Sequence, residues 1–115
     1  EVGLDSRRNG EEGQARALDW QIRTANEAAG AILGVDLEGC IGQNMLEVAE
    51  GKPLLEQFVD VGRRHIDAGD TEWREQIVLR GEVGRRVLMC ACSALPGAAG
   101  ESAGYVVVFD DVTNG

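Results

Sequence analysis

Apolar residues near the start of the chain recur with the two-residue period of a β-strand. Leu18, Trp20 and Ile22 follow this period, which places successive apolar side chains on one face of an extended chain. One or two short strands are therefore predicted between residues 15 and 25. Residues 1–14 are polar and charged without such a pattern, so we expect them to form a linker or leader ahead of the folded domain.

Two helices are predicted in the middle of the chain, where the apolar spacing changes. Asn26 is suited to begin the first helix, because its side-chain oxygen can accept a hydrogen bond from an unpaired backbone amide. This helix is expected over residues 27–33 and should end at Gly34. A longer helix should begin at Pro53, since apolar residues recur after it at spacings of three and four until Gly69.

The C-terminal half of the chain predicts three strands joined by turns. Around Ile77, apolar residues alternate with arginine and glutamine, which indicates a strand with one face in water. Residues 87–95 are almost wholly apolar, as in an inner strand, and residues 105–109 should form the central strand. Helices grouped before consecutive strands are typical of an α+β fold with an antiparallel sheet.

The length and the charge of the chain limit its architecture and its partners. Its 115 residues are enough for one domain. A formal net charge of −9 disfavours binding to nucleic acid and to anionic lipid, both of which attract clustered Lys and Arg. We therefore predict no nucleic-acid partner and no direct membrane contact by this domain. No apolar run approaches the length of about 20 residues that a membrane helix needs.

Residues suited to metal or catalytic chemistry are few. Cys40, Cys90 and Cys92 make an odd number of cysteines, as expected of free thiols in a reducing cytoplasm. The two later cysteines are two positions apart on one strand, too far for an easy disulfide, and we expect them to be core residues. His65 is the only histidine and is expected to be partly exposed near Asp67. We therefore predict no metal site and no catalytic residues.

Three runs of residues together resemble a PAS domain. They are TANEAAGAILG at 24–34, GQNMLEVAE at 42–50 and GYVVVFDDVT at 104–113. In that family an Asn begins the first helix, where Asn26 stands, and the last strand ends in an Asp-hydrophobic-Thr signature, here Asp111 to Thr113. The resemblance implies a five-stranded antiparallel sheet with helices packed on one face around a small pocket. We place this PAS-like domain at residues 15–113.

The first and last of these runs are similar to the cytoplasmic PAS domain of NtrY-type nitrogen-regulation sensor histidine kinases. That resemblance implies a homodimeric module of a two-component system, which relays a conformational signal to a C-terminal kinase core of the same chain. It also implies that Asp111 and Thr113 take part in the relay. The domain is expected to be a cytoplasmic piece of a longer, membrane-anchored protein and not to be an enzyme itself.

The resemblance also bears on cofactors, and we predict none. Flavin photoreceptors of this fold carry Cys in a Gly-x-Asn-Cys motif, where this chain has Met45, whose thioether cannot become a nucleophile. Haem sensors place their axial ligand earlier on the long helix than His65. The expected pocket is therefore either closed by its own side chains or open to a small apolar ligand. Its lining would be Ile32, Leu33, Met45, Leu46, Leu55, Phe58, Ile77 and Leu88.

Two alternative functions remain open from the sequence. In the first, a small ligand or haem bound to the same fold is the direct signal. In the second, which is more remote, the chain is a small α+β enzyme of the isomerase type. Such an enzyme needs a carboxylate or a Tyr facing the cavity. Tyr105 and Glu75 are the only candidates, and a position at a strand edge explains both more simply.

Overall fold

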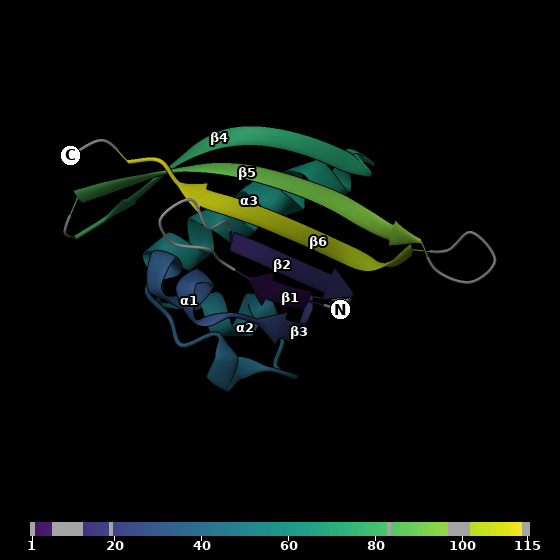
Figure 1. Cartoon of the computed structure of the whole chain (residues 1–115), viewed down its shortest axis with the longest axis horizontal. Coiled ribbons are helices and arrows are strands. Elements are labelled where there is room, and N and C mark those ends of the chain that lie inside the picture. Colours follow the sequence, from purple (N-terminus) through teal and green to yellow (C-terminus); the bar gives the residue numbers. More distant parts are fainter. Residues whose placement is uncertain (1, 6–12, 19, 83, 97–101, 114–115) are drawn as a thin grey trace.

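The described strands form one six-stranded sheet, and the helices cover one of its faces (Figure 1). The computed structural model describes residues 2–5, 13–18, 20–82, 84–96 and 102–113. In chain order the elements are β1 (Val2–Asp5), β2 (Gly13–Leu18), β3 (Gln21–Ala25), α1 (Glu27–Leu33), η1 (Glu38–Cys40), α2 (Met45–Ala49), α3 (Pro53–Asp67), β4 (Glu72–Gly81), β5 (Gly84–Pro96) and β6 (Ser102–Asp111).

The strand order β1-β3-β2-β6-β5-β4 contains the predicted antiparallel sheet. Neighbouring strands in the series β3, β2, β6, β5 and β4 pair antiparallel. Strands β4, β5 and β6, which follow one another in the chain, form a meander. The strand that contains residues 105–109 lies between β2 and β5, at the centre, as its hydrophobicity predicts. The α+β fold class is therefore confirmed.

The sixth strand, β1, differs from the sequence prediction. Residues 1–14 were expected to form a linker or leader, but Val2–Asp5 is a strand that pairs parallel with β3 and β6. The segment also contains the start of β2 at Gly13. Val2 and Leu4 stand two apart, but two apolar positions are too few for the period on which the prediction rested.

The period at Leu18, Trp20 and Ile22 spans a turn and not one strand. Trp20 lies between β2 and β3 with a φ of 62°, a left-handed conformation that ends extended pairing. The backbone amide of Ile22 donates to the carbonyl of Gln43 at 2.8 Å. The segment before α2 is therefore bonded to the start of β3.

Helix α1 begins and ends at the predicted residues. The side chain of Asn26 accepts a hydrogen bond from the amide of Ala29 at 2.9 Å. Gly34 has a φ of 75° and donates its amide to the carbonyl of Gly30 at 2.7 Å, which is the left-handed cap expected of glycine. Asn44 has the same role before α2, where its side chain accepts from the amides of Leu46 and Glu47.

The long helix α3 lies along the edge strand β4 and packs against it. On α3, the side-chain nitrogen of Gln57 donates to the carbonyl of Arg80 at 2.7 Å. The side-chain oxygen of Gln57 accepts from the amide of Arg80 at 2.8 Å. These two bonds satisfy backbone groups on the open side of an edge strand, where unpaired groups would otherwise invite another chain. Figure 1 shows α3 behind the sheet, over the face that the core occupies.

The core lies between that face of the sheet and the helices. On β4, the residues Trp73, Ile77 and Leu79 are buried, Glu75 on the same face is half-buried, and the alternate residues Arg74, Gln76 and Val78 are exposed. At the centre, the ring of Phe109 on β6 packs against the ring of Phe58 on α3, with the ring centroids 5.2 Å apart. Phe109 has no exposed surface, so this contact joins the middle of the sheet to the long helix.

Gly30 permits a close approach between α1 and the segment that follows it. A Cβ atom at this position would lie 2.5 Å from the carbonyl oxygen of Val35 and 3.3 Å from the amide of Leu37. Both neighbours are backbone atoms, so neither can move aside as a flexible side chain would. In contrast, a Cβ atom at Gly62 of α3 would meet only the Trp20 ring, at 3.8 Å.

These two helical glycines should therefore respond in opposite directions to the same substitution. Gly30→Ala should lower the free energy of unfolding by about 1–3 kcal/mol, because the added methyl group overpacks against backbone. Gly62→Ala should raise it by up to about 1 kcal/mol, because alanine favours a helix. Urea unfolding of both variants measures the difference. A stabilised Gly30→Ala protein would contradict the packing described for α1.

Candidate functional site

The residues predicted to line a pocket come together in the core. Seven of them are buried, and the eighth, Leu46, is partly buried against the same cluster. Met45, which stands where flavin photoreceptors carry their Cys, is only 3% exposed. The set that packs together is Ile32, Leu33, Met45, Leu46, Leu55, Phe58, Ile77 and Leu88. The structure thus agrees with core packing of these side chains, and binding of a ligand among them stays a prediction.

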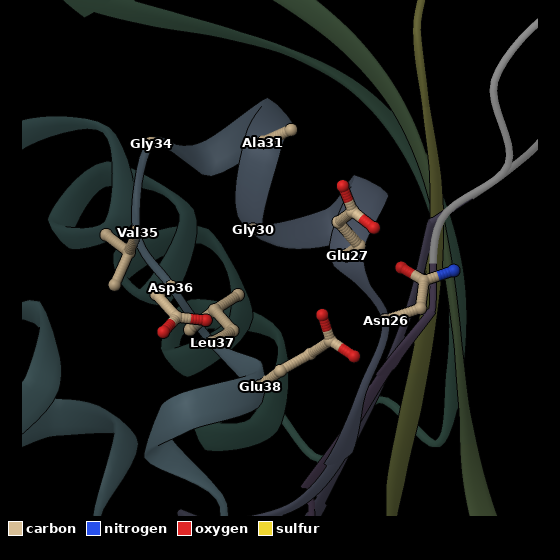
Figure 2. A pocket seen from close by; sticks show the side chains of 9 residues that line it. All are labelled: Asn26, Glu27, Gly30, Ala31, Gly34, Val35, Asp36, Leu37 and Glu38. Carbon is tan, nitrogen blue, oxygen red and sulfur yellow. The ribbon is translucent and has the colours of Figure 1, made fainter.

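A separate groove opens between α1 and the segment that leads into η1 (Figure 2). Its volume is about 370 Å³, and none of the eight predicted residues lines it. Figure 2 shows the carboxylates of Glu27 and Glu38 around the opening, near Asn26. Asp36 adds a third carboxylate to the lining. This groove would repel anions, and it contains no histidine that could bind haem iron.

The end of β6 is tied to the beginning of β5. The amide and the hydroxyl of Thr113 both donate hydrogen bonds to Oδ1 of Asp111. The Thr113 hydroxyl in turn accepts from the amide of Val87 at 2.8 Å, and the amide of Val112 donates to the carbonyl of Val87 at 2.8 Å. Arg86 lies 3.6 Å from the Asp111 carboxylate. We call these contacts of Asp111 and Thr113 with Arg86 and Val87 the terminal anchor.

The terminal anchor fixes the direction in which the chain leaves the sheet. Thr113 both donates and accepts, so its hydroxyl position is determined from two sides. The ion pair between Arg86 and Asp111 adds little by itself, because both side chains are about one-third exposed. The two residues predicted from the resemblance are thus in contact, whereas their partners on β5 were not predicted.

His65 lies near the end of α3 between two carboxylates. Its Nδ1 is 2.7 Å from Asp70 and its Nε2 is 2.7 Å from Glu75. The ring also stacks on Trp73 of β4, with centroids 4.1 Å apart and planes 9° apart. Hydrogen bonds to Asp70 and then Glu75 raise the pKa of His65 above its usual 6.5, and burial opposes them more weakly.

This arrangement changes the expectations for His65 and Glu75. The predicted neighbour was Asp67, but the carboxylates that bind the ring come from the following turn and from β4. An axial bond to haem iron would require the imidazole to leave one of them. Glu75, a candidate acid or base of the alternative enzyme, is bound to the imidazole instead.

The cysteines behave as core or near-core residues. Cys90 and Cys92 are buried and all three cysteines are free thiols, as the sequence predicts. Burial raises the pKa of both Cys90 and Cys92 to about 12, which keeps them protonated and unreactive at neutral pH. Within the described ranges, no group of three or more His, Cys, Asp or Glu side chains could hold a metal ion.

The sheet face opposite the helices carries apolar residues that no other described element covers. Val78 of β4 is 40% exposed and its partner Val87 is buried, whereas Met89, Ala91, Val106 and Val108 on the same face are half-buried. We define the outer face by the residues that the strand register places there together, which are Val78, Met89, Ala91, Val106 and Val108. Exposed arginines Arg74 and Arg80 of β4 flank this apolar strip.

None of the helices in the described part of the chain combines the length and the apolarity that crossing a bilayer requires.

Comparison with known proteins identifies the fold. A family model described as the PAS fold matches residues 17–114, and no curated protein matches the chain. Among solved structures, a domain of an HTR-like protein from Haloarcula marismortui is 19% identical with a TM-score of 0.60, covering 89% of this chain and 98% of that one. A PAS domain from Colwellia psychrerythraea is also 19% identical with a TM-score of 0.60, covering 87% and 86%.

A third neighbour is the VqmA dimer of Vibrio cholerae, described as a LuxR-type receptor that binds DNA. It is 18% identical with a TM-score of 0.62, covering 97% of this chain and 45% of that one, and VqmA has also been solved bound to DPO. Identities this low show a common fold and nothing finer. Since the family model spans nearly the whole sequence, the chain belongs to the PAS-fold family.

Proposed function

We propose that this PAS domain is the sensory and dimerisation module of a two-component sensor histidine kinase, which relays a conformational signal to a C-terminal kinase core of the same protein. The observation that carries the proposal is the terminal anchor. It ties residues 111–113 to β5, so whatever follows the domain leaves from a rigid point on the sheet. We further propose an NtrY-type role in nitrogen regulation, on the resemblance of the first and last sequence runs.

The terminal anchor supports a relay that works by displacement of strands and involves no chemical reaction in the domain. A shift of β5 relative to β6 would change the position of Val87, and Thr113 would follow because its hydroxyl is bonded to that strand. A small displacement in the sheet thereby becomes a change in the direction of the outgoing chain, which is how packed elements switch between discrete arrangements. In this proposal the isolated domain is not an enzyme. It lies in the cytoplasm as part of a membrane-anchored protein.

The outer face supports homodimerisation. An isologous dimer brings the same surface of two copies together, so the surface must be complementary to itself. The apolar strip meets that need along β5 and β6, at Met89, Ala91, Val106 and Val108. The same face carries positive Arg74 and Arg80 on the edge strand β4 and negative Asp110 beside Met89, so that opposite charges can meet across a two-fold axis.

A second candidate function is favoured by the groove beside α1. Its volume of about 370 Å³ is enough for a small molecule, and VqmA, which has the same fold, has been solved bound to DPO. In this alternative a small ligand is the direct signal. The carboxylates of Glu27, Asp36 and Glu38 in the lining would favour a neutral or cationic compound over an anionic one.

Removing the carboxylate of Asp111 tests the relay. In the parent protein, Asp111→Ala should change the basal rate of autophosphorylation, because Thr113 loses its acceptor and the outgoing chain is no longer fixed. The isolated domain should stay folded, losing only about 1 kcal/mol of stability with these exposed bonds. Asp60→Ala, an exposed substitution on α3, is the matched control. Equal phosphorylation rates in Asp111→Ala, Asp60→Ala and wild type would count against the relay.

An added charge on the outer face tests the dimer. Val78→Glu should weaken self-association at least tenfold, about 1.4 kcal/mol per protomer pair, because it places like charges at the interface. Analytical ultracentrifugation measures the dissociation constant. Ile41→Glu provides the control, since Ile41 is similarly exposed at 45% but follows η1 in the helical layer. A wild-type chain that stays monomeric, or equal weakening by both variants, would contradict the proposed interface.

A further inference from the structure

The bonding of His65 requires a particular protonation state. A neutral imidazole has one N–H donor and one lone pair, whereas the imidazolium cation has two donors. Both ring nitrogens lie 2.7 Å from a carboxylate oxygen. Ionised carboxylates only accept hydrogen bonds, so both contacts can be hydrogen bonds only when the ring carries two protons. Loss of either proton sets a lone pair against a carboxylate.

The charged groups that contact the ring both favour its doubly protonated form. The following turn contributes Asp70 and the facing strand β4 contributes Glu75. On α3 itself, Arg64 and Asp67 are exposed beside His65 and carry opposite charges. On β5, the strand beside β4, Cys90 pairs with Glu75 and Cys92 pairs with Trp73. Both cysteines are buried neutral thiols. A cation in the last turn is also favoured by the helix dipole.

Helix α3 is held to β4 at two places with different chemistry. Near its N-terminal end, the Gln57 amide bonds to the backbone of Arg80, and neither group titrates near neutral pH. Near its C-terminal end, His65 bonds to Glu75 and stacks on Trp73. A change in pH can therefore loosen one end of the helix while the other end stays attached.

We propose that His65, Asp70 and Glu75 form a proton-operated latch that fastens the C-terminal end of α3 to β4 when the imidazole is doubly protonated and releases it when one proton is lost. Glu75 and Asp70 can then turn to water, because their side chains are already 35% and 43% exposed. The second tie at Gln57 makes the motion a pivot of α3 and not its detachment. The latch proposal is independent of the kinase core proposed above.

The sign of the pH effect follows from the direction of the pKa shift. The pKa of His65 in the folded chain is raised above 6.5 by its hydrogen bonds to Asp70 and Glu75. A group whose pKa is higher in the folded state stabilises the fold fully below its unfolded pKa. That stabilisation is lost as the pH rises through the folded pKa. The latch is therefore closed in mildly acidic solution and opens toward alkaline pH.

Nuclear magnetic resonance can follow the latch directly, because His65 is the only histidine and gives one imidazole signal. The titration midpoint of this signal should lie above 6.5 in the folded chain. Glu75→Gln and Asp70→Asn should each lower the midpoint while keeping the size of the side chain. A wild-type midpoint at or below 6.5, or a midpoint that neither substitution moves, would overturn the proposal.

Unfolding as a function of pH distinguishes a latch from a histidine that merely titrates. From about pH 5.5 to about pH 9, a range around the ordinary histidine pKa, the wild type should lose stability relative to His65→Gln. Gln57→Ala, which breaks the tie that does not titrate, should shift the wild-type curve by a constant amount. Parallel curves for wild type and His65→Gln would show that the carboxylate contacts do not fasten α3, and the proposal would fail.

Discussion

Phe109 packs against Phe58 where the middle strand of the sheet meets the long helix, and the rest of the structure depends on this contact. The apolar side of β4, β5 and β6 can leave water only if α3 and the shorter helices lie over it. That requirement places the helices on one face of the sheet. The described elements leave the other face uncovered, and its apolar strip is where we propose that a second copy packs.

The contacts on which the relay and the latch are proposed lie at the margins of this core. The terminal anchor is at one end of the β4–β6 meander, where Leu88 pairs with Asp111. The His65 latch is farther along the same strands, where Glu75 pairs with Cys90 and Cys90 pairs with Phe109. Strand β5 takes part in both pairings, so the two proposals concern the same packed unit.

Sequence rules for helix ends and for strand hydrophobicity predicted the parts of the fold that depend on contacts between nearby residues. Asn26 and Gly34 fix the ends of α1 through bonds within a few residues, and Pro53 starts α3. The central position of β6 followed from its hydrophobicity. Strand β1 could not be predicted, because four residues are too few to show a period and its partners on β3 and β6 are distant in the sequence.

The candidate sites likewise combine contacts between nearby residues, which the sequence predicted, with contacts between distant residues, which it did not. Asp111 and Thr113 were identified by a motif of adjacent residues, and their mutual bonds are local. Their partners on β5 are more than 20 positions away, at Arg86 and Val87. The carboxylates that bind His65 come from a turn and a strand, positions that no helical period indicates. The groove beside α1 likewise depends on the path of the chain after Gly34.

Urea unfolding of Phe109→Ala and Val108→Ala tests the central claim most directly, because these neighbours lie on opposite faces of the same strand. The account predicts that Phe109→Ala lowers the free energy of unfolding by about 3–5 kcal/mol. Val108→Ala should cost less than about 1.5 kcal/mol, since its side chain lies on the half-buried outer face. Equal losses in the two variants, or a larger loss for Val108→Ala, would contradict the placement of the core beneath the helices.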